Sequence, residues 1–121
     1  MAVILIVEDD VFIRELAELI IQEAGHDTLL ASDVEEALLI LNTPQTIDLL
    51  FTDIYLKKLV NGGLELAQHA IRIRPSLPVL YTTGNIISDD MKELFVKFSK
   101  FLSKPYTLHQ LRESFQVLLT K

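Results

Sequence analysis

Carboxylates, a hydroxyl and an amine each stand just behind an apolar run that is typical of a buried strand. These residues are Glu8 and Asp9 after 3–7, Asp53 after 47–52, Thr83 and Gly84 after 77–82, and Lys104 after 100–103. In an open parallel sheet, ligands bind at the carboxyl ends of the strands. Magnesium favours carboxylate and carbonyl oxygens. The grouping therefore predicts a magnesium-assisted phosphoryl site, with Asp53 as the acceptor.

The acidic residues also have ordinary structural interpretations. Asp9 or Asp10 can cap the helix that follows; Asp10 is the better cap and Asp9 the better metal ligand. Asp53 alone would be a turn residue, because Asp is common at strand ends. Beside Glu8 and Asp9, however, it can stay ionised on magnesium and attack phosphorus to give an acyl phosphate.

The hydroxyl and the amine fit the same chemistry. The Thr83 hydroxyl can donate to a phosphoryl oxygen, and Gly84 allows close approach of the backbone, although both are also common at strand ends and turns. The Lys104 ammonium suits phosphate as a point charge, or it can pair with Asp53 or Glu8. The bond between Lys104 and the proline after it is a candidate for a cis peptide, because a tight turn there would aim the lysine inward.

Composition and charge exclude several classes of protein. The 121 residues suffice for one domain, 1–121, and half of them are hydrophobic with few aromatics, which favours an aliphatic α/β core. A net charge of -6 argues against direct binding to nucleic acid. The absence of Cys excludes disulfides and thiolate metal sites. No run is long enough to span a membrane and no basic leader precedes the first run, so we expect a cytoplasmic protein without membrane insertion.

Apolar runs alternate with helical periodicity along the chain. The expected strands are 3–7, 27–31, 47–52, 77–82 and 100–103. This alternation predicts an α/β fold, a five-stranded parallel sheet with helices on both faces. No glycine-rich phosphate loop follows the first strand, which argues against a dinucleotide or P-loop enzyme.

The helices are predicted from apolar spacing and from capping residues. Phe12, Leu16, Leu19 and Ile20 repeat at helical spacing after the first strand. Ser32 or Asp33 can cap a second helix, and Ser88 or Asp89 a helix that runs to 97. Thr107 can cap a last helix that turns Leu108, Leu111, Phe115 and Leu118 inward.

Taken in order, these residues resemble the receiver domains of two-component response regulators. The motifs that carry the resemblance are Glu8-Asp9, Asp53, Thr83-Gly84 and Lys104-Pro105. The resemblance implies a flavodoxin-like fold with strand order 2-1-3-4-5. It also implies that Asp53 takes a phosphoryl group from a phosphohistidine on a sensor histidine kinase or a histidine phosphotransfer protein. The output would be a downstream protein partner or a fused output domain.

The resemblance also implies a role for each site residue. Asp9, Asp53 and the backbone carbonyl of Tyr55 would hold magnesium, with Glu8 acting directly or through water. Thr83, Gly84 and Lys104 would bind the phosphoryl group. Thr83 and Phe101 would form the switch that biases the output surface.

Some residues depart from the family pattern, and other interpretations compete with it. The loop 54–63 is longer than in many receivers and lacks their proline. Tyr55 and Asn85 occupy positions that, in the family, influence how fast water removes the phosphoryl group, and shielding of the site by a bulky Tyr55 predicts a long-lived phosphoaspartate. A docking module that is never phosphorylated has no need of the acid, Thr and Lys set. A metal-dependent phosphatase commonly wants an acid where Tyr55 stands. We therefore expect a signalling phosphoacceptor rather than an enzyme, with a homodimer through 88–97 left open.

Overall fold

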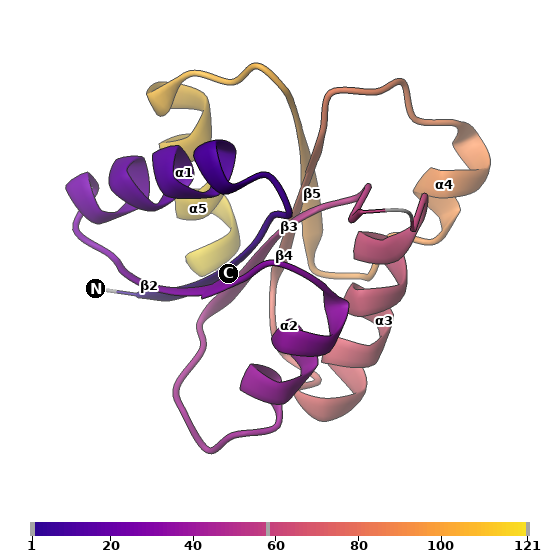
Figure 1. Cartoon of the computed structure of the whole chain (residues 1–121), viewed down its shortest axis with the longest axis horizontal. Coiled ribbons are helices and arrows are strands. Elements are labelled where there is room, and N and C mark those ends of the chain that lie inside the picture. Colours follow the sequence, from indigo (N-terminus) through magenta and orange to yellow (C-terminus); the bar gives the residue numbers. More distant parts are fainter. Residues whose placement is uncertain (1, 58, 121) are drawn as a thin grey trace.

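A five-stranded parallel sheet forms the centre of the molecule (Figure 1). The structure is a computed structural model, and it describes residues 2–57 and 59–120. The strands are β1 (Val3–Val7), β2 (Asp27–Ala31), β3 (Leu49–Asp53), β4 (Val79–Thr83) and β5 (Ser99–Ser103). They lie in the order β2-β1-β3-β4-β5 and every neighbouring pair is parallel. The predicted fold class and strand order are confirmed.

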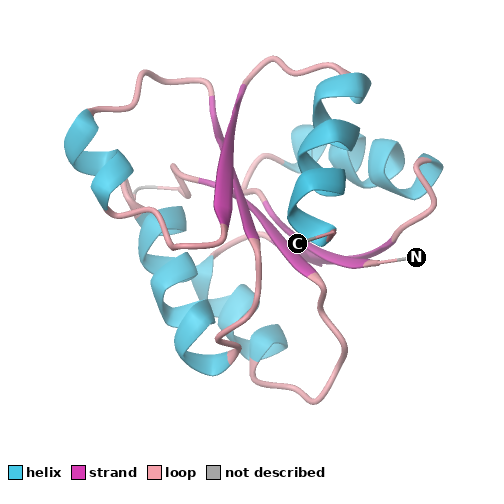
Figure 2. Cartoon of the chain, turned by 180° about the vertical axis from the view of Figure 1, so that it is seen from behind, coloured by secondary structure: helices cyan, strands magenta, loops and turns pink. Residues whose placement is uncertain are grey.

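Helices cover both faces of the sheet (Figure 2). They are α1 (Val11–Glu23), α2 (Val34–Leu41), α3 (Gly62–Ile73), α4 (Asp89–Glu93) and α5 (Leu108–Leu119). Because successive side chains of a strand point to opposite faces of the sheet, each central strand contributes to two hydrophobic cores, one on each face. Leu5 and Leu50 face α2 and α3, whereas Ile4 and Leu49 face α1 and α5. Among the described residues, no helix is both long and apolar enough to cross a bilayer.

Side-chain caps begin four of the helices, as the sequence predicts. The Asp10 carboxylate accepts the backbone N–H of Phe12 at 2.9 Å and caps α1. Asp33 caps α2 and Ser88 caps α4. Thr107 begins α5 in a reciprocal capping box with Gln110. Since Asp10 is the cap, Asp9 is left for the site.

Three strands differ from the prediction by one or two residues at their ends. The predicted strand 47–52 begins at Leu49, because the Asp48 carboxylate turns to accept the N–H of Val3 at 2.8 Å, and it ends with Asp53 itself. The predicted strand 77–82 begins after Pro78, which has no N–H to offer, and includes Thr83. β5 begins one residue earlier than predicted. Asp53 and Thr83 are therefore held by the sheet rather than by loops.

The predicted helix 88–97 is wrong beyond Glu93, where α4 ends. Phe95 instead stacks on Tyr81 at a centroid distance of 4.4 Å. The N–H of Val96 donates to the Tyr81 hydroxyl at 3.1 Å. Burial raises the pKa of Tyr81 to about 12, so this hydroxyl stays neutral. A buried tyrosine thus draws the chain out of the helix, and the suggested dimer helix is only a short one.

The helix α1 is confirmed, but the apolar residues that predict it are not those that it buries. Phe12 and Leu16 are 80% and 57% exposed, whereas Ala17 and Ile21 are buried. A small side chain such as Ala17 lets the helix axis approach the sheet, which turns the bulkier residues outward. The inward prediction is also wrong for Leu108, which is 38% exposed at the start of α5.

Candidate functional site

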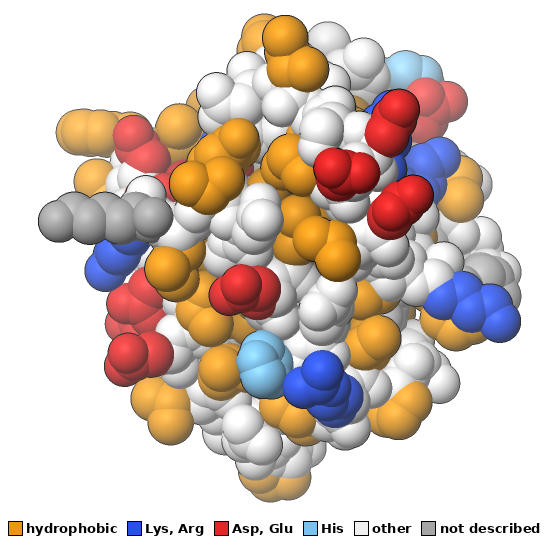
Figure 3. All heavy atoms as spheres, turned by 90° about the vertical axis from the view of Figure 1, so that its right-hand side faces the viewer, with side chains coloured by type: hydrophobic (Ala, Val, Ile, Leu, Met, Phe, Trp, Pro, Cys, Tyr) orange, Lys and Arg blue, Asp and Glu red, His pale blue; other side chains and the backbone are white. Residues whose placement is uncertain are grey.

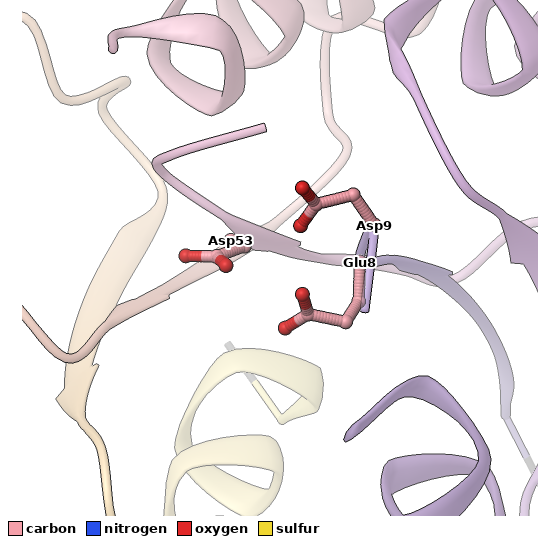
Figure 4. A group of neighbouring side chains, drawn as sticks. All are labelled: Glu8, Asp9 and Asp53. Atoms are coloured by element: carbon pink, nitrogen blue, oxygen red, sulfur yellow. The ribbon is translucent and has the colours of Figure 1, made fainter. Parts of the chain in front are cut away.

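Three carboxylates meet at the carboxyl edge of the sheet, where β1 and β3 lie side by side. Glu8 and Asp9 follow β1, and Asp53 ends β3. One oxygen from each lies within 4.8 Å of the others, and Figure 4 shows the three side chains around a common space. Glu8 and Asp53 are buried and Asp9 is half-buried. The three acids that the sequence assigns to one site are therefore neighbours in the structure.

Lys104, the residue after β5, completes the site. Its Nζ donates to Glu8 Oε1 at 2.7 Å and to Asp53 Oδ2 at 3.1 Å. The Lys104–Pro105 peptide bond is cis, as predicted. Both ion pairs proposed as alternatives are therefore present together, and the lysine bridges the ends of β1 and β3.

The surroundings of the site favour the protonated forms of Glu8 and Asp53. Burial raises the pKa of Glu8 and of Asp53 above their ordinary values, and the nearby Lys104 cation offsets this only in part. Burial alone would lower the pKa of Lys104, but its hydrogen bond to Glu8 and the two carboxylate charges raise it overall. The lysine stays charged, while the carboxylates lack compensating positive charge.

One oxygen atom of Asp53 is the place where a partner is missing. Asp53 Oδ1 is buried and accepts no hydrogen bond from the part of the chain that the structure describes. Buried polar atoms without partners are rare in native proteins. Glu8, in contrast, uses both oxygens, since Oε2 accepts the N–H of Asp10 at 3.1 Å. An unpartnered carboxylate oxygen among three acids fits a hard divalent cation such as magnesium.

The end of β4 supplies the predicted hydroxyl and an open glycine. Thr83 is buried, and its hydroxyl oxygen accepts the N–H of Asn85 at 3.2 Å. A Cβ added to Gly84 would meet nothing closer than the Lys104 Cβ, 3.9 Å away. The predicted switch aromatic, Phe101, is half-buried and lies 6.3 Å from another phenylalanine ring of the α4–β5 segment. The two predicted switch residues lie on neighbouring strands.

Residues 4–116 match the family model described as the response regulator receiver domain. The chain belongs to this family. The match includes the three acids, Thr83 and Lys104. The predicted family is thus confirmed over nearly the whole chain.

The receiver is similar to regulatory proteins of two bacteria. Over 109 residues it is 33% identical to an uncharacterized transcriptional regulatory protein, YrkP, of Bacillus subtilis, covering 89% of this chain and 45% of that protein. It is 34% identical over 110 residues to the response regulator protein PilR of Pseudomonas aeruginosa, covering 90% of this chain and 24% of PilR. The chain therefore spans less than half the length of these relatives.

Solved receiver structures superpose closely on this one. A response regulator receiver protein from Sinorhizobium medicae is 27% identical with a TM-score of 0.88, covering 98% of this chain and 94% of its own. The receiver domain of the hybrid histidine kinase CckA is 31% identical with a TM-score of 0.79, covering 98% and 99%. The chemotaxis protein CheY4 of Vibrio cholerae is 25% identical with a TM-score of 0.87, covering 98% and 99%.

Sequence reasoning missed the constraint that Gly63 places on the receiver's β3–α3 loop. A Cβ at Gly63 would lie 2.0 Å from the backbone carbonyl oxygen of Asp53. The N–H of Gly63 also donates to the Ile54 carbonyl at 2.8 Å. Only glycine lets the start of α3 pack this closely behind Asp53. The Gly62-Gly63 pair in the sequence was the available signal.

The loop also makes a contact with the acids that no sequence pattern predicts. The backbone N–H of Lys57 donates to Asp9 Oδ2 at 2.8 Å, and the Lys57 Nζ pairs with Asp33 Oδ2 at 3.2 Å. Leu56 and Leu59 form an isolated antiparallel bridge on either side of this contact. The loop predicted at 54–63 is therefore folded against the site, although Lys58 lies outside the described residues.

Proposed function

We propose that this receiver is a phosphoacceptor in two-component signalling, and that Asp53 accepts the phosphoryl group. The observation that carries this proposal is the unpartnered, buried Asp53 Oδ1 among two further acids and a lysine. The donor would be a phosphohistidine on a sensor histidine kinase or a histidine phosphotransfer protein. A carboxylate oxygen of Asp53 would form the bond to phosphorus as the bond from phosphorus to the histidine nitrogen breaks.

Asp9, Asp53 and the Tyr55 carbonyl are the groups that we propose to hold magnesium. When bound, the ion would neutralise charge that builds up on the transferring phosphoryl oxygens. Because Lys104 and the Asp10 N–H occupy both oxygens of Glu8, Glu8 would act through water rather than as a direct ligand.

Thr83, Gly84 and Lys104 would bind the phosphoryl oxygens after transfer. Lys104 already lies 3.1 Å from Asp53 Oδ2. The Thr83 hydroxyl would turn from Asn85 to donate to a phosphoryl oxygen, and the open position at Gly84 leaves its amide accessible. Positioning and charge neutralisation then account for the transfer without a further acid or base.

Movement of Thr83 would bias the rotamer of Phe101 and so the surface made by α4, β5 and α5. Ile86, Leu94 and Phe98 are exposed in the segment from the end of β4 to the start of β5. Figure 3 shows the side that carries α3 and α4, where apolar side chains are scattered among charged ones. A surface of this mixed kind suits a regulated, reversible contact with a downstream partner or an output domain.

The outer face of α1 is the surface that we propose for the phosphodonor protein. Phe12, Leu16 and Leu19 are all more than half exposed. Together with Val11 they form an apolar helix face that begins just after the acids. A histidine-bearing helix packed there would bring its phosphohistidine towards Asp53. The proposed setting is the cytoplasm, where such kinases expose their catalytic parts.

Labelling with a small phosphodonor tests the proposal without a kinase. The wild type is incubated with acetyl phosphate and magnesium, and the intact mass is measured, with Asp53→Asn and an excess of EDTA as controls. We expect one added phosphoryl group that needs magnesium and is absent in the variant. An unlabelled wild type that also fails to bind magnesium would favour a docking module that is never phosphorylated.

The side chain of Tyr55 is the residue that we propose to slow loss of the phosphoryl group. Tyr55 is half-buried beside the acceptor strand and packs against the α2–α3 core. Its bulk would limit approach of water to the acyl phosphate. Tyr55→Ala should therefore shorten the lifetime of phosphorylated Asp53. An unchanged dephosphorylation rate would contradict this role.

A further inference from the structure

We propose that the backbone N–H of Lys57 positions Asp9 for magnesium. The inference rests on the proposed function, because it concerns the metal site of the same phosphoacceptor. The N–H of Lys57 donates to Asp9 Oδ2 at 2.8 Å, across 48 positions of sequence. The loop after the acceptor thus acts on a carboxylate from the opposite side of the site.

Contacts of Leu56 and Leu59 hold the chain on either side of the donor. Leu56 and Leu59 exchange backbone hydrogen bonds of 3.2 and 2.9 Å. Leu56 is buried, and the N–H of Gly62 donates to the Leu59 carbonyl at 3.1 Å. A Cβ at Gly62 would lie 3.0 Å from the Leu59 Cβ, so the turn packs directly on the start of α3. The described residues before and after the Lys57 amide are thus anchored to each other and to the start of α3.

The backbone conformation of Lys57 is unusual, and it is one that a tight turn after Leu56 can require. Its φ is 56°, and no other non-glycine residue among 2–57 and 59–120 has a positive φ. Side chains other than those of Gly, Asn and Asp seldom adopt this region. Strained residues of this kind concentrate where a site needs them. The residue with this unusual φ is the one whose N–H reaches Asp9.

The Lys57 amide and the Lys57 side chain have separate contacts. The ammonium pairs with Asp33 in an exposed ion pair, whereas the N–H reaches Asp9. Holding one oxygen of Asp9 restricts rotation of its carboxylate and leaves the other oxygen for the ion. Groups that orient metal-binding carboxylates in this way commonly change metal affinity by about 10- to 100-fold.

Magnesium affinity measured by calorimetry on the unphosphorylated receiver tests the inference. Lys57→Pro removes the N–H and cannot adopt a positive φ, so we expect its dissociation constant to rise about tenfold. Lys57→Gly keeps the N–H and favours a positive φ, so it should bind at least as tightly as the wild type. Asp33→Asn, which keeps the cap and removes the ion pair, is the matched control and should bind like the wild type. Equal affinities of wild type and Lys57→Pro would overturn the inference.

Hydrogen exchange of the Lys57 amide gives a second readout that does not depend on the proline variant. Coupling between two sites is reciprocal, so magnesium should slow exchange of this amide in the wild type. Asp9→Ala should speed it. Exchange that is insensitive to both would overturn the inference even if the labelling of Asp53 succeeds. A wild type that neither binds magnesium nor becomes labelled would instead overturn the proposed function itself.

Discussion

Two regions of the molecule depart in opposite ways from the usual distribution of residues. The carboxyl edge of the sheet buries acidic side chains, and the outer face of α1 exposes apolar ones. At the sheet edge, Glu8 and Asp53 are acidic residues that are only 5% and 7% exposed. On α1, Phe12 and Leu16 are apolar and largely exposed. A buried charge or an exposed apolar cluster is the informative departure from a normal protein surface.

The two regions differ in what they do to the stability of the fold. Burial at the sheet edge destabilises the charged form of the acids, and Lys104 compensates only in part. The apolar residues on α1 neither strain nor stabilise the core, because they do not reach it. The sheet edge therefore lowers the stability of the fold, whereas the exposed face of α1 leaves it unchanged. Ligand binding would relieve the strain at the edge, whereas a partner protein would cover the helix face.

The largest loss of stability is expected at Gly63, which packs against the backbone of the sheet edge. Gly63→Ala sets a Cβ against the Asp53 carbonyl oxygen, and backbone on both sides cannot yield. We expect a loss of about 3 kcal/mol or more in the free energy of unfolding. Gly84→Ala is the matched control in open space and should change it by less than about 0.5 kcal/mol. Denaturant unfolding measures both, and equal stability of the two variants would contradict the packing described for Gly63.

Removing the cation from the sheet edge should be nearly as costly. Lys104→Met leaves two buried acids without their shared partner, and we expect a loss of about 2–3 kcal/mol. Lys57→Met breaks only an exposed ion pair and should cost less than about 0.5 kcal/mol. Denaturant unfolding at neutral pH makes the comparison. Similar losses in both variants would mean that burial of the Lys104 pairs has no energetic consequence.

A substitution on α1 should separate partner contact from chemistry. Leu16→Ser lies on the exposed face, so the free energy of unfolding should change by less than about 0.5 kcal/mol. Labelling by acetyl phosphate should stay the same. Phosphotransfer from a cognate phosphorylated protein should fall about tenfold, which corresponds to about 1.4 kcal/mol of lost contact. Unchanged phosphotransfer would remove α1 from the docking surface.

The smallest effect concerns pH. The pKa values of Glu8 and Asp53 are raised in the folded state, so folded protein binds more protons than unfolded protein in the weakly acidic range. Their contribution to stability therefore increases as pH falls from neutral towards their unfolded values and is lost as pH rises. The advantage of Asp53→Asn over the wild type in EDTA should therefore shrink from pH 7 to pH 4.5. An advantage that grows on acidification would contradict the raised pKa of Asp53.

Much of the fold and most of the site could be predicted because local signals there agree with the final packing. Apolar runs gave the strands, and polar residues at their ends marked the ligand-binding edge. Asp10, Asp33 and Thr107 were recognisable caps because a cap interacts with the next turn of its own helix. The family resemblance then supplied the strand order, which no local signal contains.

The rest depended on contacts between distant residues. The buried face of α1 is set by how closely Ala17 lets the helix approach the sheet, which helical spacing alone does not specify. The end of α4 depends on Tyr81, a residue of another element. The turn at Lys57 uses a backbone N–H, which every residue except proline has, so no side-chain pattern marks it. The constraint on Gly63 is a distance to a backbone oxygen, visible only after folding.

Thermal unfolding of wild type and Asp53→Asn, each with EDTA and with magnesium, tests most directly whether Asp53 is kept buried for a ligand rather than for the fold. In EDTA, the variant should be more stable by about 1 kcal/mol, or roughly 4 °C in midpoint, because it lacks the buried charge of which one oxygen, Oδ1, has no hydrogen-bond partner. Magnesium should stabilise the wild type, by about 2.7 kcal/mol at one hundred times its dissociation constant, and the variant much less. A variant that is less stable in EDTA, with no effect of magnesium on either protein, would make Asp53 a structural partner of Lys104 and contradict the account.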